Sequence, residues 1–340
     1  MADDGARLTA WLIANLPGIV PPVRLDPLPG GRSNLTSVVE DAGGRRWVVR
    51  RPPRAPVLAT AHDVLREARI VAALATTPVP VAPVRATCAD SAVDGAPFVV
   101  SDFVAGHVLR DSASARAASS VCRARAGTDL ARALARLHRL RPEEVGLAEL
   151  ARPGDYVGRQ VRRWTRQVEA GDGECRDLLV GLGARVAEAV PPQERVAVVH
   201  GDPKLDNCVL DDDGRLLALV DWELAAIGDP TADLALLLAY WAEPADPRAA
   251  LQDPPSAVPG FAPRAELVEA YREEVGWRPR HLEAYLAFSY WKLACIVAGV
   301  AHRALHPIGA ATPDRGSVRR SLTQVERLVG MAQDALEHPG

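Results

Sequence analysis

A change of pattern near Gly106 constrains the fold of this 340-residue chain more than any other feature. Between Leu25 and Val104, short runs of β-branched and aromatic residues are separated by glycine-rich or polar turns, which indicates an antiparallel sheet. After Gly106, long segments rich in alanine, leucine and arginine indicate helices. Because a single core seldom grows beyond roughly 250 to 300 residues, we predict an α+β chain with two lobes, residues 1–104 and 105–340.

The same patterns give the expected elements of each lobe. In the first lobe we expect strands at 35–39, 46–50 and 97–100, an amphipathic helix within 1–17, and one inserted helix at 61–75 before a proline-rich break. In the second lobe we expect three strands, at 196–199, 208–210 and 216–220, and a long loop at 244–263. The helices of the second lobe are expected at 112–140, 153–170, 174–189, 230–242, 263–275, 280–304 and 316–336.

Charge and cysteine content exclude several classes of protein. A net charge of −3 and a pI near 6.3 give no broad positive field, so nucleic acid is not an expected partner. The five cysteines are scattered and lack any CxxC spacing, which indicates a reducing compartment and no zinc site. No signal peptide and no run of roughly 18 uninterrupted apolar residues is visible. We therefore expect a cytoplasmic protein with no membrane segment; the oligomeric state stays open.

The densest functional signal is the loop 200–207, His-Gly-Asp-Pro-Lys-Leu-Asp-Asn, which is followed by Asp221. If the turn at 211–214 folds the two flanking strands back on each other, Asn207 and Asp221 meet at their outer ends. Magnesium prefers oxygen ligands and usually takes one or two protein groups besides nucleotide phosphates. Asn207 and Asp221 are therefore candidate metal ligands. Asp202 is placed to accept the proton of an attacking hydroxyl.

This ordered set resembles the aminoglycoside phosphotransferase and choline kinase group, which has a protein-kinase-like fold. The resemblance implies two lobes, ATP and Mg²⁺ as cofactors, and transfer of the γ-phosphate to the hydroxyl of a small-molecule substrate. It places Asp202 in the position of the catalytic base within the loop 200–207, and puts the metal ligands in the hairpin 207–223. Protein kinases have Asp-Phe-Gly where this chain has Asp221-Trp222-Glu223, so only the aspartate is carried over.

Three further residues near this loop are better explained by structure than by chemistry. His200 is expected to support the loop, because a buried, hydrogen-bonded histidine is commoner than a catalytic one. Asp233 falls within an apolar helix, where the resemblance implies hydrogen bonds to backbone amides of the loop. Asp229 precedes Pro230, a favourable pair for a helix N-cap and first helical residue.

Upstream residues indicate a nucleotide site. Gly30, Gly31, Arg32 and Ser33 lie between two predicted strands and resemble a shortened phosphate-covering loop, although a two-glycine hairpin is also common without a ligand. Arg50 stands where the family usually has a lysine that contacts the α- and β-phosphates. Arg51 is an alternative for that contact.

Glu67 and the residues at the end of the sheet are also predicted to belong to the nucleotide site. Glu67 shares the apolar stripe of its helix and therefore needs a partner, for which Arg50 is the obvious candidate; a self-contained pair with Arg66 or Arg69 is the alternative. In the family the adenine binds backbone where the sheet meets the helices. That implies that the carbonyl of Asp102 and the amide of Val104 bind the adenine, although an interlobe linker explains the composition of this segment equally well.

Four further phrases resemble one subgroup, the kinase-like domains associated with acyl-CoA dehydrogenases: Leu28 to Thr36, Val49 to Pro53, Arg159 to Trp164 and Asp221 to Ala225. This subgroup implies an acceptor hydroxyl on an acyl chain or acyl-CoA rather than on an antibiotic. A basic helix face at Arg159, Arg162, Arg163 and Arg166 is consistent with coenzyme A, but also with plain solvation. The alternative function is a nucleotide-binding pseudokinase-like or regulatory module without transfer, slightly favoured by Arg50 in place of lysine.

Overall fold

The computed structural model describes residues 2–28, 34–52, 63–171, 173, 175–306 and 314–338. The chain forms two compact units. The first unit comprises residues 1–106 together with 217–225, and the second comprises 107–216 with 226–340.

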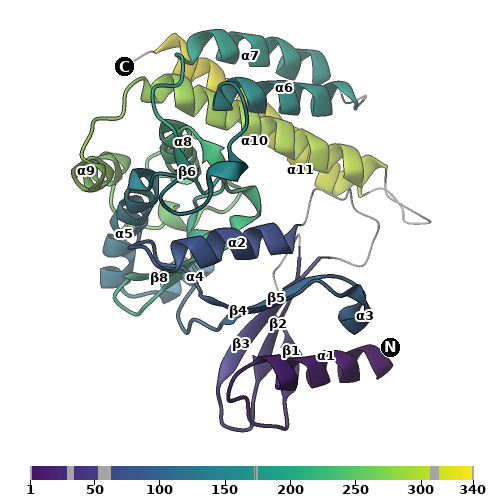
Figure 1. The fold of residues 1–340 in the computed structure, drawn as a ribbon. Coiled ribbons are helices and arrows are strands. Elements are labelled where there is room, and N and C mark those ends of the chain that lie inside the picture. The colour runs from purple at the N-terminus through teal and green to yellow at the C-terminus, as the bar shows by residue number, and fades with distance from the viewer. Residues whose placement is uncertain are drawn as a thin grey trace. The chain divides into compact units, whose positions relative to one another are not determined.

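The first unit is built on a five-stranded antiparallel sheet with the order β1-β2-β3-β5-β4 (Figure 1). Its strands are β1 (Arg24–Pro27), β2 (Leu35–Glu40), β3 (Arg46–Arg51), β4 (Val84–Cys88) and β5 (Phe98–Asp102). Strands β2, β3 and β5 confirm the three predicted ones. Strands β1 and β4 were missed, because edge strands of four or five residues with proline or arginine in them bury too little to show strong alternation.

Helices cover both faces of this sheet. Helix α1 (Ala2–Asn15) packs Leu8 and Leu12 against Val49 and Phe98 on one face, beside the short helix α3 (Ser91–Asp94). Helix α2 (Val64–Leu74) packs Val64 and Ala68 on Val99 of the opposite face. Side chains alternate along a strand. Arg50 therefore lies on the face opposite to Val49, the face that α2 covers.

Residues 217–225 belong to the first unit, whereas the sequence analysis placed them with the second lobe. Two long-range contacts explain this position. The Leu219 amide donates to the Pro80 carbonyl oxygen at 2.8 Å, and Arg66 of α2 donates to the Ala225 carbonyl. Such contacts join residues about 140 to 160 positions apart and leave no local periodicity from which they could be predicted.

The second unit contains eight described helices and one short strand pair. The helices are α4 (Ser112–Ala117), α5 (Ser120–Arg139), α6 (Tyr156–Glu169), α7 (Arg176–Ala189), α8 (Pro230–Tyr240), α9 (Arg264–Val275), α10 (Leu282–Leu305) and α11 (Arg315–Glu337). These confirm the predicted helical segments, with one correction. The segment 112–140 forms two helices because Ser119, in an extended conformation, caps the N-terminus of α5 by accepting from the Cys122 amide.

The strand pairs frame the loop that carries the main motif. Strand β6 (Ala197–Val199) pairs antiparallel with β9 (Ala226–Gly228), which was not predicted, and β7 (Cys208–Leu210) pairs with β8 (Leu216–Leu219). Single 3₁₀ turns occur at Ala148–Leu150, Leu205–Asn207, Trp222–Leu224 and Pro255–Ala257. The predicted loop 244–263 contains the last of these and no α-helix or strand.

Helix α10 is the central helix of the second unit's core and runs beside α11 (Figure 1). Trp291 is fully buried, and its indole N–H donates to the Leu179 carbonyl of α7 at 2.7 Å. A Cβ added to Gly183 would meet the same ring at 2.7 Å, so only glycine allows this approach. By length and composition α10 could span a membrane, but 61% of its most apolar window is buried within the fold, as in a core helix.

The turn between β7 and β8 gives a test of this packing. Gly214 has φ +77°, and an added Cβ would lie 2.8 Å from the Cys122 Cα and would also collide with the Cys122 carbonyl oxygen. Gly276 has φ +80° with open space around it, so Gly276→Ala should cost only the left-handed backbone penalty of about 1–2 kcal/mol. We expect Gly214→Ala to cost at least about 1 kcal/mol more. Urea unfolding of both variants measures the difference, and equal losses would contradict the packing described.

Candidate active site

The carboxylate of Asp233, on helix α8, holds the loop 200–207 through hydrogen bonds. Asp233 accepts from the His200 amide at 2.7 Å and the Gly201 amide at 2.8 Å, and its Oδ2 lies 3.2 Å from His138 Nε2. Burial raises the pKa of Asp233, but these donors and the nearby histidines outweigh it and keep the pKa below its ordinary value. This is the role predicted for Asp233.

His200 is completely buried and takes part in holding the loop. Its Nδ1 accepts from the Asp202 amide at 3.2 Å, and the intervening Gly201 has φ +83°. That left-handed conformation is costly for any residue with a Cβ, which explains the glycine between His200 and Asp202. The contacts match the supporting role predicted for His200.

Asp202 lies at the end of this turn with both carboxylate oxygens occupied. Its Oδ1 accepts from the Tyr240 hydroxyl at 2.6 Å, and its Oδ2 lies 2.9 Å from Lys204 Nζ. Burial opposes ionisation, but Lys204 and the Tyr240 hydrogen bond outweigh it, so the pKa of Asp202 is lowered from its ordinary value. Asp202 is therefore an ionised carboxylate at neutral pH, in a fixed orientation.

The side chain of Asn207 points its amide nitrogen toward Asp202. Nδ2 donates to the Asp202 carbonyl oxygen at 2.8 Å and to Oδ2 at 3.1 Å. The amide oxygen therefore points away from these contacts, and this is the atom that could serve a hard cation. Among the described residues there is no group of three or more His, Cys, Asp or Glu side chains arranged to hold a metal ion.

Two residues beyond the motif also support the loop, and the sequence analysis missed both. Tyr240 is the last residue of α8, and Lys292, on α10, points its Nζ at the Gly201 carbonyl oxygen at 3.3 Å. Lys292 is buried, and burial lowers its pKa despite the attraction of Asp202 and Asp233. The one available signal was a single lysine in an otherwise apolar stretch of α10.

A second group of predicted site residues gathers in the first unit, around Arg50. Arg50 Nε lies 3.5 Å from Glu67 Oε2, which confirms the predicted pair. Arg50 Nη2 also lies 2.5 Å from Asp221 Oδ1 and 3.6 Å from Glu223 Oε2. Asp221 adopts φ +67°, a left-handed conformation that is uncommon for a residue other than glycine. One guanidinium therefore faces three carboxylates.

This excess of negative charge perturbs Glu67. Burial, together with the charges of Asp221 and Glu223, outweighs the attraction of Arg50 and raises the pKa of Glu67 to about 7. Its Oε1 is buried and makes no hydrogen bond within the described part of the chain. Glu67 is thus poised between its neutral and ionised forms near neutral pH.

Arg51 is separated from this cluster. Its Nη1 lies 2.5 Å from Oδ2 of Asp94, the buried last residue of α3. Of the two neighbouring arginines, the structure therefore assigns Arg50 to the carboxylate cluster and Arg51 to a separate ion pair within the first unit.

The remaining predicted contacts are only partly described. Gly30, Gly31, Arg32 and Ser33 lie outside the described residues. Asp102 ends β5, and its side chain accepts two hydrogen bonds from Arg85, while Val104 follows in an irregular segment.

On the basic face of α6, Arg159 donates to the carbonyl oxygens of Arg152 and Pro153. The Arg163 guanidinium lies 5.3 Å from the centre of the Trp164 ring. These two residues therefore already have partners within the fold.

A family model described as the phosphotransferase enzyme family matches residues 24–282, which is about three quarters of the chain. The chain belongs to this family. The matched range contains the loop 200–207, Arg50, Glu67 and Asp221.

Two curated relatives in mouse place the chain near one branch of the family. Acyl-CoA dehydrogenase family member 10 is 31% identical over 310 residues, and member 11 is 32% identical over 316 residues. Each alignment covers 89% of this chain but only 29% and 40% of the relative. The chain therefore spans well under half the length of these relatives, and corresponds to their kinase-like domain.

Solved structures confirm the protein-kinase-like fold. A Ralstonia eutropha protein assigned provisionally to the aminoglycoside phosphotransferases superposes with a TM-score of 0.76 and 28% identity, covering 97% of this chain and 98% of that one. Choline kinase from Cryptosporidium parvum superposes with a TM-score of 0.66 and 12% identity, covering 98% and 96%. At that lower identity the likeness concerns the fold alone.

The raised pKa of Glu67 predicts a pH dependence of stability. Between the ordinary pKa near 4.5 and the folded pKa of about 7, the folded chain keeps a proton that the unfolded chain has lost. Stability contributed by this group therefore falls as pH rises from 5 to 8. Glu67→Gln should remove the fall and gain up to about 3 kcal/mol relative to the native chain over that range.

Chemical denaturation at pH 5, 6.5 and 8 measures this change. Glu40→Gln, which removes a more exposed carboxylate from the same unit, is the matched control. The assignment of the pKa to Glu67 fails if the native chain and Glu67→Gln show parallel pH profiles.

Proposed function

We propose that the chain transfers the γ-phosphate of ATP to a hydroxyl group of a small molecule, with Asp202 as the base. The observation that carries this proposal is the environment of Asp202. Its carboxylate is partly buried, ionised and held by Tyr240, Lys204 and Asn207 within the family's characteristic loop. A carboxylate held in one orientation is suited to act as a general base, whereas a carboxylate on a surface loop is usually solvated.

In the proposed step, the γ-phosphate moves from ATP to the hydroxyl oxygen of the substrate. The substrate hydroxyl gives its proton to an oxygen of Asp202 while its own oxygen forms a bond to the γ-phosphorus. The bond from that phosphorus to the oxygen shared with the β-phosphate breaks, and ADP leaves with that electron pair. Because the carboxylate oxygens contact Tyr240 and Lys204 before substrate arrives, the hydroxyl must share or replace one of these contacts.

Two oxygen-bearing side chains are of the kind that a magnesium ion prefers. Asn207 has its amide nitrogen committed to Asp202, which leaves its oxygen as a proposed ligand, and Asp221 is proposed to supply a carboxylate. Two oxygen donors are the usual protein contribution to a magnesium–nucleotide complex. When bound, the ion would neutralise phosphate charge. Arg50, with its partner Glu67, is proposed to contact the nucleotide phosphates.

For the acceptor we propose a hydroxyl on an acyl chain or acyl-CoA. Support comes from the similarity to two acyl-CoA dehydrogenase family members over 89% of this chain, in relatives that also contain a much longer remainder. The neighbouring activities of the fold, on aminoglycosides and choline, define the other acceptors that need testing.

Replacing the base tests the proposal directly. We expect Asp202→Asn to lower the rate of substrate-dependent ADP release by at least about a hundredfold, the low end for removing a general base. The assay is a panel of hydroxyacyl-CoAs, choline-like alcohols and aminoglycosides. Asp213→Asn, an exposed carboxylate in the β7–β8 turn, is the control and should keep full activity. Full activity of Asp202→Asn would remove Asp202 from this role, and no turnover with any acceptor would favour a nucleotide-binding module.

The metal site predicts a separate effect on binding. ATP with Mg²⁺ at 100 times its dissociation constant should stabilise the native chain by about 2.7 kcal/mol. Asp221→Asn should lose most of this gain, because a carboxylate ligand becomes a neutral amide. Thermal unfolding with ATP, with and without Mg²⁺, makes the measurement. An unchanged magnesium-dependent shift in Asp221→Asn would contradict its assignment as a ligand.

A further inference from the structure

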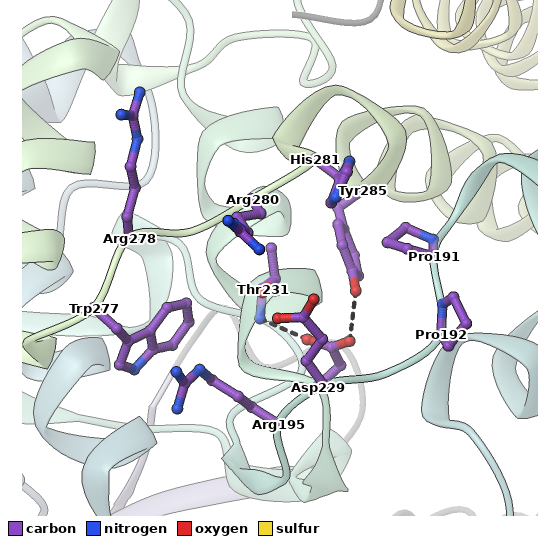
Figure 2. Close-up of a pocket in the computed structure, with 11 residues that line it drawn as sticks. Pro191, Pro192, Arg195, Asp229, Thr231, Trp277, Arg278, Arg280, His281 and Tyr285 are labelled. Atoms are coloured by element: carbon purple, nitrogen blue, oxygen red, sulfur yellow. Dashed lines mark hydrogen bonds between the residues drawn. The ribbon is translucent and has the colours of Figure 1, made fainter.

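The second unit contains a cavity of about 230 Å³ that is separate from the loop 200–207. It is lined by the segment before β6, the N-terminal end of α8 and the segment leading into α10 (Figure 2). The lining side chains used below are Arg195, Asp229, Trp277, Arg278, Arg280 and Tyr285. We call this the cationic pocket. Neither Asp202 nor Tyr240 lines it.

The positive charges of the cationic pocket are not neutralised by the protein. Within the part of the chain that the structure describes, no carboxylate lies within ion-pair distance of Arg195, Arg278 or Arg280. Elsewhere on the same unit, arginines such as Arg264 and Arg272 do have such partners. Three exposed arginines around one cavity without acidic partners give it a positive charge that suits an anion.

The acidic residues of the cationic pocket do not supply that anion. Asp229 is buried and accepts from the Thr231 amide at 2.8 Å and the Tyr285 hydroxyl at 2.7 Å, so both of its oxygens are occupied (Figure 2). Burial raises the pKa of Asp229 despite these donors. Glu194, the other acidic lining residue, is exposed to solvent.

Arg195 is held in a conformation suited to binding an oxyanion. Its guanidinium lies 4.7 Å from the centre of the Trp277 ring. Stacking on a ring fixes the guanidinium plane and leaves its N–H edges for hydrogen bonds to a planar or tetrahedral oxyanion. Figure 2 shows Arg195 and Arg280 on the side of the pocket that carries Trp277, while Arg278 extends away from Asp229.

The segment that presents these arginines is itself constrained. Pro279 is buried between Arg278 and Arg280, and His281 adopts φ +55°, a left-handed conformation. A non-glycine residue in that region costs of order 1–3 kcal/mol and persists where the surroundings fix it, often at ligand-binding segments. Arg280 is therefore presented by a fixed segment rather than by a free loop.

We propose that the cationic pocket binds the oxyanion group of a small metabolite, a phosphate or a carboxylate, through Arg195 and Arg280. Its volume corresponds to roughly seven water molecules at about 30 Å³ each, which is below the range of about 300–1,000 Å³ for sites that enclose a whole drug-sized ligand. A charged head group with a small scaffold fits, whereas a whole nucleotide does not. The pocket would thus be a second ligand site, independent of the proposed phosphotransfer.

Isothermal titration of the full chain with inorganic phosphate and, separately, with succinate tests this proposal at fixed ionic strength. Saturating ATP with Mg²⁺ is present throughout, to keep phosphate out of any nucleotide site. We expect one site with a dissociation constant on the order of 1 mM or tighter for at least one of the two anions. Preference between them identifies the head group, and equal binding assigns a general oxyanion site.

Two variants locate the site. Arg280→Gln and Arg195→Gln should each weaken binding at least about tenfold, because each removes a charge-assisted hydrogen-bond donor. Arg272→Gln removes the same charge from α9, outside the pocket, and should leave affinity unchanged. Absence of binding to both anions, or equal affinity in all variants, would overturn the proposal. ATP-induced stabilisation of the Arg280→Gln variant should match the native chain, which separates this site from the phosphotransfer site.

Discussion

The arrangement of the loop 200–207 depends on one buried carboxylate, that of Asp233. Two consecutive backbone amides, those of His200 and Gly201, have no other way to satisfy their hydrogen-bonding capacity once buried, and an ionised carboxylate provides both acceptor atoms. The cost of burying that charge is offset by four neighbours, His138, His200 and the two amides. Because these two amides are fixed, the direction of the chain after Gly201 is fixed as well. This direction sets the position of Asp202.

The charges around this loop are balanced within the second unit. Asp202 and Asp233 both have pKa values below their ordinary range, although burial opposes ionisation of each. Lys204 and the Tyr240 hydroxyl offset this effect at Asp202, whereas His138, His200 and the Gly201 amide offset it at Asp233. Lys292 donates to the Gly201 carbonyl rather than to a carboxylate, so it occupies no oxygen of Asp202.

Much of this arrangement was predictable from the sequence, because the informative residues lie close together in the chain. The spacing of Asp202 and Asn207, the cap at Asp229, and the position of Glu67 on an apolar helix stripe are local patterns, and local patterns follow from helix and turn geometry. Tyr240, Lys292 and Glu223 could not be assigned in the same way. Each reaches its partner through a tertiary contact across tens of residues or more, and such contacts impose no periodicity on the sequence. Edge strands β1 and β4 were missed for a related reason, since short exposed strands carry little alternation.

The arginine at position 50 has a physical consequence that a lysine would not reproduce. Its Nε faces Glu67 and its Nη2 faces Asp221, so two different edges of one planar group join helix α2 to the residue after β8 within the first unit. A lysine has a single ammonium on a flexible stem and could satisfy both carboxylates only if they approached one point. Approach of that kind would increase the repulsion among Glu67, Asp221 and Glu223, which already raises the pKa of Glu67. The guanidinium therefore allows three carboxylates to stay apart while sharing one cation, one of them on Asp221 in its left-handed conformation.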